Sequence, residues 1–233
     1  MAPSSPEVRR LARRAFSNYG RMLADFALIG ALSAEELRSR VELRGLAGVD
    51  AVLARGRGCV VALPHTGSWD WAGSAGGVHG YRMFAVADPF PGSLDAAVAA
   101  DRSRFGLRVI PAGRSAVRAV SDALAANGVV ALVCDLEHGP GVEVEFFGRR
   151  AIVPGGPAAF ALKAGAGLVS AHVWSTGPGR YAAQLEPELE VVASGDRKTS
   201  TQAVMQQVIR RFEVAIRRRP DQWFAFRPLG KAL

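Results

Sequence analysis

Two side chains in one turn have the types and the spacing of a proton-transfer pair. His65 follows the apolar run of residues 59–64, which predicts a buried strand, and Asp70 lies five positions further on. An imidazole accepts a proton near neutral pH, and a carboxylate on its other ring nitrogen fixes the tautomer and stabilises the imidazolium. The four intervening residues form a tight turn that lets Asp70 fold back toward the ring. The spacing therefore predicts a general base; the alternative is that both side chains bond only to the backbone of the turn.

Several other chemistries lack their sequence signatures. The chain has no Gly-x-Ser-x-Gly elbow and no Gly-x-x-x-x-Gly-Lys loop, and Gly177-x-Gly179 precedes a strand rather than a helix. Cys59 and Cys134 fall in apolar segments, which indicates reduced core thiols rather than a disulfide or a nucleophile. No Cys-x-x-Cys or paired His/Cys spacing predicts a zinc site. A base without a protein nucleophile suits direct transfer, in which a substrate hydroxyl attacks while His65 takes its proton.

Strand and helix patterns alternate along most of the chain. This alternation predicts an α/β fold with a mainly parallel central sheet, covered by helices on both faces and preceded by a helical segment. His65 then lies where such sheets place their chemistry, at the end of a strand. A capping box at Ser33 starts one predicted helix. The other predicted helices cover 7–30, 48–55, 69–78, 93–104, 114–126, 157–165 and 198–218. The predicted strands cover 59–64, 81–87, 107–110, 129–134, 142–147, 167–174 and 181–191.

The length and composition fit one soluble domain. All 233 residues form a single unit in this interpretation, with amphipathic helices over 1–45 and the α/β core over 46–233. No stretch is long and apolar enough to span a bilayer, and residues 1–7 lack a secretory pattern. We therefore expect a cytoplasmic protein.

Basic residues outnumber acidic ones and gather near both ends. Lys and Arg total 29 against 21 Asp and Glu, which gives a net charge of +8, with arginine clusters over 9–21 and 210–219. This surplus predicts an anionic partner, whether nucleic acid, a membrane surface or a phosphorylated substrate; the alternative is a solvated helix face. Helix 7–30 is amphipathic, and it either lies in a membrane interface or packs on the domain.

The motif from His65 to Asp70 resembles the signature of the lysophospholipid acyltransferase superfamily. Within it, the chain is most similar to bacterial lipid A biosynthesis acyltransferases and actinobacterial phosphatidylinositol mannoside acyltransferases, over about residues 35–229. Five segments in the right order make the resemblance specific. Those segments, besides the histidine motif, are Arg102-Ser103-Arg104-Phe105-Gly106, Leu132-Val133-Cys134-Asp135, residues 142–148, Pro154-Gly155-Gly156-Pro157 and residues 219–224.

The resemblance implies roles for the acidic residues. His65 would be the general base and Asp70 its motif partner. Glu143 or Glu145 could supply a second carboxylate near the histidine, because both point to one face of the strand over 142–147, and we favour Glu143. The alternative for both glutamates is an exposed strand edge. Asp135, at a strand end, would orient neighbouring groups rather than react.

The resemblance also implies groups that bind substrate. Arg102 and Arg104 would hold a phosphate of the donor or acceptor, or stabilise the developing oxyanion. The alternative is that both arginines lie at a solvated helix end and bind no substrate. Backbone N–H groups of the turn formed by Gly67, Ser68 and Trp69 could also bind the oxyanion.

The chain departs from the family pattern at two points. Relatives usually carry more N-terminal sequence with an apolar anchor, whereas this chain begins near its amphipathic helix, which favours peripheral membrane association. Family members often have Asp-Arg-Asp after the central strand, whereas this chain has Asp135-Leu136-Glu137. This chain therefore lacks the arginine that, in the family pattern, could contact a phosphate or support the structure at this point.

Taken with the resemblance, these features predict an O-acyltransferase of glycolipid biosynthesis. It would move a fatty acyl group from acyl-CoA or acyl carrier protein to a lipid hydroxyl, with a phosphatidylinositol mannoside as the most specific acceptor, and would need no metal or redox cofactor. We expect peripheral contact with an anionic membrane, on the inner face of the plasma membrane, and no nucleic acid. The alternatives are another lipid or secondary-metabolite acceptor, an esterase, or a non-catalytic module that binds anionic lipid or nucleic acid.

Overall fold

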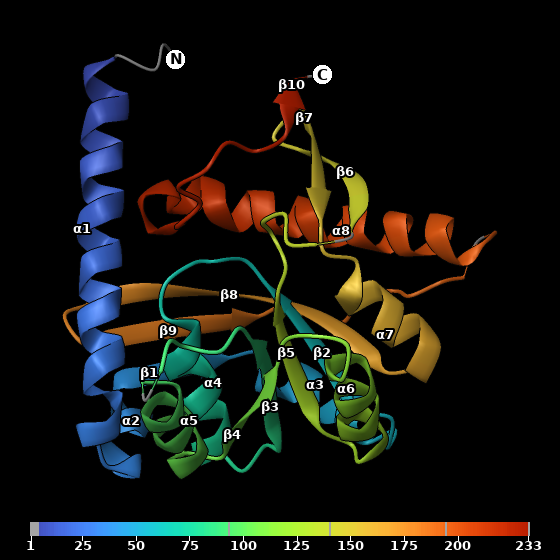
Figure 1. Ribbon diagram of the computed structural model, residues 1–233, viewed down its shortest axis with the longest axis horizontal. Helices are drawn as coiled ribbons and strands as arrows, with labels where there is room; N and C mark the ends of the chain where they lie inside the picture. Colours follow the sequence, from blue (N-terminus) through green and yellow to red (C-terminus); the bar gives the residue numbers. More distant parts are fainter. Residues whose placement is uncertain (1–4, 93, 140, 194, 233) are drawn as a thin grey trace.

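A seven-stranded sheet organises the chain and confirms the predicted α/β class. The computed structural model describes residues 5–92, 94–139, 141–193 and 195–232 (Figure 1). The strand order in the sheet is β1-β9-β8-β2-β5-β3-β4, and every neighbouring pair is parallel except β8 with β9. A second sheet, β10-β7-β6, is antiparallel and packs against α8. The strands are β1 (Val41–Arg44), β2 (Cys59–Leu63), β3 (Met83–Ala87), β4 (Leu107–Pro111), β5 (Val129–Val133), β6 (Val142–Phe146), β7 (Arg149–Val153), β8 (Gly167–Gly177), β9 (Arg180–Leu185) and β10 (Lys231–Ala232).

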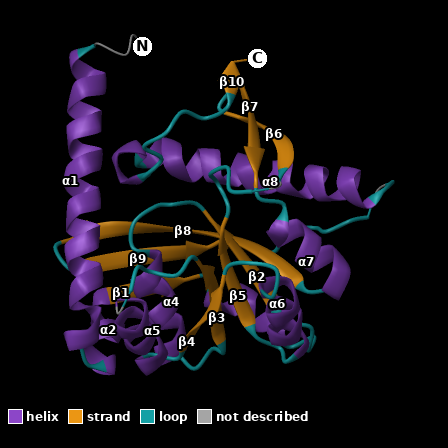
Figure 2. Cartoon of the chain, in the orientation of Figure 1, coloured by secondary structure: helices purple, strands orange, loops and turns teal. Residues whose placement is uncertain are grey.

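Helices cover both faces of the large sheet (Figure 2). Along β2, Val60 and Ala62 join a core cluster with residues of α6, α7 and α8, whereas Val61 and Leu63 join a cluster on the side of α3. This double burial explains why β2 is apolar at every position, as expected for a central parallel strand. The helices are α1 (Pro6–Leu28), α2 (Ala34–Arg40), α3 (Leu46–Leu53), α4 (Trp69–Val78), α5 (Leu94–Arg104), α6 (Ala116–Ala125), α7 (Gly156–Ala164) and α8 (Arg197–Arg218), with 3-10 turns η1 (Ile29–Ala31) and η2 (Pro220–Gln222).

The long N-terminal helix α1 stands along one side of the molecule (Figure 1). Its aromatic side chains meet the segment after α8: Phe16 stacks on Phe226 with 4.5 Å between ring centroids, and Tyr19 contacts Phe224 at 5.3 Å. Helix α1 therefore packs on the domain. Among the described residues, no helix has both the length and the apolarity needed to cross a bilayer.

The elements differ from the sequence prediction in three places. Residues 41–44, expected in the helical segment, form the edge strand β1, whose four residues are too few for a periodic pattern. Strand β9 ends at Leu185 rather than at 191, because Pro187 cannot donate to a strand ladder. The short strands β7 and β10 were not predicted.

Candidate active site

Strand register brings His65 and Asp135 to the same point at the sheet edge. Strands β2 and β5 are parallel neighbours in which Leu63 pairs with Val133. His65 and Asp135 each follow their strand by two residues, so both side chains emerge at the same level beyond the carboxyl ends. A bond from the Cys134 amide to the Leu63 carbonyl, at 3.0 Å, continues the pairing past the strands. This edge is where open α/β sheets place ligands.

The His65 imidazole and the Asp135 carboxylate form a short hydrogen bond. Nδ1 of His65 lies 2.6 Å from Oδ1 of Asp135, and the indole Nε1 of Trp223 donates to Oδ2 at 2.7 Å. Asp135 is fully buried, whereas the His65 side chain is 32% exposed. A carboxylate only accepts, so Nδ1 is the donor to Asp135, and in the neutral imidazole Nε2 is the nitrogen that carries the lone pair. The pair thus has the geometry of a histidine base oriented by an acid.

The loop after β2 is fixed by its backbone contacts. Gly67 has a positive φ of +57°, and a Cβ at this position would lie 2.6 Å from the Val173 backbone, so only glycine fits. The Val173 amide also donates to Oγ1 of Thr66 at 3.3 Å. The Gly67 N–H donates to the Gln222 carbonyl at 3.3 Å, so this predicted oxyanion donor already has an acceptor.

The structure pairs Asp70 with Arg102 rather than with His65. Oδ1 of Asp70 accepts from Nε of Arg102 at 2.7 Å, and the two side chains are only 8% and 9% exposed. Asp70 is the second residue of α4 and its carboxylate reaches α5, so it does not fold back to the ring as the spacing predicted. Burial raises the pKa of the Asp70 carboxyl, and the adjacent guanidinium opposes that rise. The carboxylate at the imidazole is instead Asp135.

The other predicted charged residues lie away from the imidazole. Arg104 is exposed and donates to the Gly30 carbonyl, which ties α5 to η1. Glu143 accepts from Arg150 at 2.8 Å across the β6–β7 hairpin, and Glu145 is exposed on the same strand. The strand-edge alternative thus describes both glutamates, and Glu143 does not supply the carboxylate bonded to His65.

Trp69 connects the histidine to an apolar cavity. Its ring meets the His65 ring edge-on, at 5.3 Å between centroids and 85° between planes, and it also lines the cavity. The cavity of about 70 Å³ lies between the large sheet and helices α3 and α4. Beside Trp69, the buried Oγ of Ser68 finds no hydrogen-bond partner among the described residues. The lining is almost entirely apolar: Leu43, Leu46, Val49, Val61, Leu63, Ala72, Gly73, Gly76, Tyr81, Met83, Val129, Ala131, Ala171, Val173, Ala183 and Leu185.

The two cysteines are buried and are not bonded to each other. Desolvation raises the pKa of Cys59 to about 12 and raises that of Cys134 well above its ordinary value. Neither thiol is ionised near neutral pH, so neither is an activated nucleophile. Within the described part of the chain, no three His, Cys, Asp or Glu side chains gather as metal ligands.

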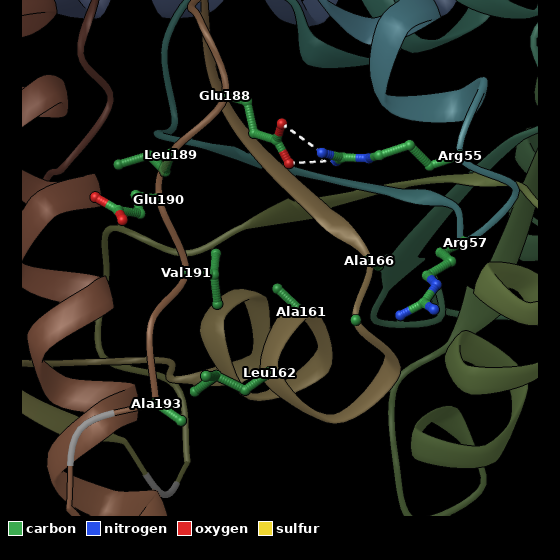
Figure 3. Close-up of a pocket in the computed structure, with 11 residues that line it drawn as sticks. Arg55, Arg57, Ala161, Leu162, Ala166, Glu188, Leu189, Glu190, Val191 and Ala193 are labelled. Carbon is green, nitrogen blue, oxygen red and sulfur yellow. Dashed lines mark hydrogen bonds and ion pairs between the residues drawn. The ribbon is translucent and has the colours of Figure 1, made fainter.

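A larger hollow opens at the opposite end of the strands. It has a volume of about 890 Å³, and its lining contains none of the residues predicted for the site. Figure 3 shows Arg55 bonded to Glu188 at its rim, with Arg57 on the wall; Nη1 of Arg55 lies 3.0 Å from Oε2 of Glu188. This hollow lies by the amino ends of β2 and β8, away from His65, and neither a histidine nor a cysteine is among the described residues that line it.

A buried histidine on β8, His172, gives the protein a pH-dependent stability. Burial and the nearby Arg219 and Arg218 lower its pKa to about 4, although Glu186 lies 3.8 Å from its Nδ1. The unfolded chain takes up this proton near pH 6.5, so stability is full above that pH and falls as the pH drops to about 4. We expect a loss of about 3 kcal/mol from this residue.

Urea denaturation between pH 7.5 and pH 4 tests this prediction. The His172→Phe variant keeps an aromatic ring beside Trp174 but has no proton to bind. Its free energy of unfolding is expected to fall less steeply over this range than that of the wild type. Equal slopes for the two proteins would contradict the assignment.

Comparison with known proteins places the chain in one family. The family model described as bacterial lipid A biosynthesis acyltransferase matches residues 2–231. The chain therefore belongs to the bacterial lipid A biosynthesis acyltransferases, a family of acyltransferase enzymes, which confirms the resemblance drawn from the motifs.

Two curated relatives from the family share the same name, phosphatidylinositol mannoside acyltransferase. The chain is 33% identical over 218 residues to a phosphatidylinositol mannoside acyltransferase of Mycobacterium tuberculosis, covering 91% of this chain and 67% of that protein. It is 31% identical over 224 residues to the protein of the same name in Mycolicibacterium smegmatis, covering 94% of this chain and 71% of that one.

Proposed function

We propose that this chain transfers a fatty acyl group from a thioester donor to a hydroxyl of a membrane glycolipid, with His65 as general base. The observation that carries the proposal is the 2.6 Å contact between His65 and the buried Asp135 at the carboxyl edge of the sheet. Acyl-CoA or acyl carrier protein is the donor class, and a phosphatidylinositol-mannoside-like lipid is the acceptor. The named relatives support this choice of acceptor.

The orientation of the His65 imidazole determines which of its nitrogens accepts the proton of the acceptor hydroxyl. Nδ1 is held by Asp135, so Nε2 accepts the proton of the acceptor hydroxyl as its oxygen attacks the thioester carbonyl. The imidazolium that forms is stabilised by the carboxylate beside it. The thiolate then leaves as the tetrahedral intermediate collapses, and it recovers the proton. Because the acceptor oxygen attacks directly, no covalent acyl-enzyme is needed.

The start of α4 supplies donors for the oxyanion. The first amides of a helix have no intrahelical acceptor and lie at the positive end of its dipole. In α4 these belong to Trp69 and Asp70, and they follow the loop that holds His65. The hydroxyl of Ser68, which has no hydrogen-bond partner in the described part of the chain, is a further donor at this point. Arg102 is bonded to Asp70, so in this proposal it fixes α4 rather than binding the oxyanion.

The apolar cavity is a suitable site for the acyl chain. Cavities that hold apolar ligands are concave and lined by aliphatic and aromatic side chains, as this one is. Trp69 touches both the cavity and the His65 ring, so a chain entering beside it has its thioester near Nε2. The free space holds only a short segment of chain, so Trp69 and its neighbours must shift to admit a long acyl group.

Helix α1 is a suitable surface for peripheral contact with an anionic membrane. Arg10, Arg13 and Arg21 are exposed on it. Apolar side chains are exposed beside them, with Phe16 at 61% and Leu28 at 56%. Basic residues next to exposed apolar ones bind the interface of anionic bilayers. Peripheral binding at the inner face of the plasma membrane is therefore part of the proposal.

Removing two of these arginines is expected to weaken membrane binding. Each arginine near an anionic surface contributes about 1 kcal/mol, so Arg10→Gln with Arg13→Gln should raise the dissociation constant about 30-fold. Sedimentation with vesicles containing anionic lipid measures the change. The matched control replaces the exposed Arg82 and Arg118, which lie outside α1. Equal weakening by both pairs would show that net charge, not α1, carries the binding.

The direct test of the proposed function is product formation. The protein is incubated with palmitoyl-CoA, or with palmitoyl acyl carrier protein, and phosphatidylinositol mannoside in anionic vesicles, and the lipid is analysed by mass spectrometry. The expected result is acceptor that has gained one acyl group, in an amount that depends on His65. Thiol release with no acylated lipid would favour an esterase. Steeply salt-dependent polynucleotide binding with no product in any donor and acceptor pair would favour a binding module.

A further inference from the structure

The segment from Pro220 to Phe224, here called the 220–224 strap, lies along the loop that carries His65. The Phe224 amide donates to the His65 carbonyl at 2.9 Å, and the Gly67 amide donates to the Gln222 carbonyl at 3.3 Å. Thr66 and Trp223 form an antiparallel bridge between these two bonds. The backbone of the strap therefore holds the catalytic loop as a neighbouring strand would, although the two segments lie about 155 residues apart in the sequence.

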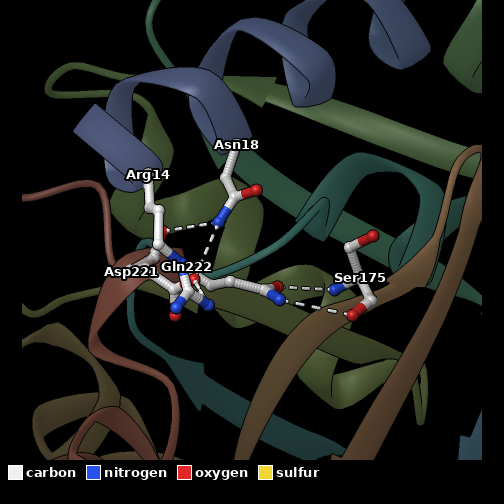
Figure 4. Close-up of polar contacts among 5 residues, drawn as sticks. All are labelled: Arg14, Asn18, Ser175, Asp221 and Gln222. Atoms are coloured by element: carbon white, nitrogen blue, oxygen red, sulfur yellow. Dashed lines mark hydrogen bonds and ion pairs between the residues drawn. The ribbon is translucent and has the colours of Figure 1, made fainter. Parts of the chain in front are cut away.

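Side chains fasten the strap on two sides (Figure 4). Asp221 accepts from Nη2 of Arg14 on α1 at 2.6 Å, and Asn18 donates to the Asp221 carbonyl at 2.9 Å. On the other side, Gln222 accepts from the Ser175 amide of β8 at 2.6 Å and donates to its carbonyl at 3.3 Å. Trp223 follows these two fixed residues and pairs with Thr66 of the histidine loop. Its backbone is therefore held by its neighbours in the strap and by the loop.

The Trp223 side chain reaches the second oxygen of Asp135. His65 occupies Oδ1 and the Trp223 indole occupies Oδ2, at 2.7 Å. The indole plane is fixed by Phe146 and Phe147, each 5.7 Å away between ring centroids. Asp135 is fully buried, so water cannot take the place of a lost donor. Losing the indole N–H would leave a buried carboxylate oxygen without a hydrogen bond, which costs free energy. Two donors, one on each oxygen, thus hold the Asp135 carboxylate in a single orientation.

We propose that Trp223 is a positioning residue for the acyl-transfer reaction, acting through Asp135 to hold the His65 imidazole in the reactive orientation. The proposal rests on the assignment of His65 as the general base. Trp223 itself touches neither reacting group: its indole N–H keeps the carboxylate from turning, and the carboxylate keeps Nε2 of His65 directed at the acceptor hydroxyl. Geometry of this kind acts on the chemical step rather than on substrate binding.

The test is Trp223→Phe, which removes the indole N–H and keeps an aromatic ring against Phe146 and Phe147. We expect kcat to fall about tenfold or more with KM nearly unchanged, the size expected for losing a hydrogen bond to a charged group. The matched control is Trp71→Phe. Trp71 is 1% exposed and donates its indole N–H to the Asp25 backbone carbonyl at 2.9 Å, so the control loses a buried indole hydrogen bond, here to a neutral acceptor, and the same ring volume.

Trp223→Met is the second variant, to be used if the phenylalanine variant does not fold; methionine fills apolar space without a donor, and it is expected to show the same loss. A spectroscopic readout that needs no substrate is the downfield proton resonance of the His65 Nδ1–H in its short bond to Asp135. It should shift or broaden in the Trp223 variants and stay unchanged in Trp71→Phe.

The outcomes separate this proposal from the proposed function. A wild-type protein without transfer activity would refute the acyltransferase mechanism, while the proton resonance would still show whether Trp223 positions the pair. Trp223 variants with wild-type kcat and an unchanged resonance would overturn the positioning role. An equal loss of kcat in Trp71→Phe would overturn it as well, because the effect would then reflect general packing.

Discussion

Replacing His65 with glutamine is expected to lower acceptor-dependent acyl transfer by about 10²–10⁴-fold, the usual contribution of a general base. Glutamine keeps a polar side chain of similar length but takes up no proton near neutral pH. The fold should persist, because the backbone bond from Phe224 to residue 65 does not depend on the side chain and the ring is one-third exposed. The measurement is the initial rate of acylated lipid formation at saturating donor.

A matched histidine variant controls for nonspecific effects. His79→Gln changes an exposed histidine at the end of α4, and it is expected to leave the rate within twofold of the wild type. Thermal unfolding of both variants checks that the fold is kept. Wild-type rates in His65→Gln would remove the histidine from the mechanism.

Replacing Arg102 with leucine is expected to destabilise the fold by about 3–5 kcal/mol, because it leaves the buried Asp70 carboxylate without its partner. The guanidinium also lies over the rings of Phe26 and Phe90, at 5.5 and 5.8 Å, and these contacts are lost with it. Urea denaturation measures the change in the free energy of unfolding.

Two further variants show whether burial of the pair is the cause. Arg104→Leu removes an exposed arginine from the same helix, and its cost is expected to be below about 1 kcal/mol. The double variant Asp70→Leu with Arg102→Leu should recover much of the lost stability, because it leaves no unpaired buried charge. If Arg102→Leu and Arg104→Leu were equally stable, the Asp70–Arg102 pair would not be a structural ion pair.

The α/β fold could be predicted because its local signals agree. The apolar strands, the capping box at Ser33 and the helix periodicities all lie within short windows, and the structure confirms almost every one of these elements. Edge strand β1 has only a weak signal, since its apolar and charged residues alternate over no more than four positions. Its place beside β9 depends on a contact made 140 residues away.

The site was predicted only in part because its contacts depend on sheet order. His65 follows from the strand and turn around it, whereas its partner depends on β5 lying next to β2, which no local pattern gives. The spacing favoured Asp70, but the position of Asp70 in the first turn of α4 directs it to Arg102. Trp223 lies in a segment that resembles the family, yet its bond to Asp135 spans 88 residues and has no sequence signal.

His65 and Asp135 are proposed to act as one unit on the acceptor proton, and a double-mutant cycle measures whether they do. Acceptor-dependent thiol release from palmitoyl-CoA is measured for the wild type, His65→Gln, Asp135→Asn and the double variant. We expect Asp135→Asn to lower the rate by at least tenfold and the double variant to be no slower than His65→Gln, because the effects of residues that act as a unit are not additive. Independent, multiplicative losses, or a wild-type rate in Asp135→Asn, would contradict it.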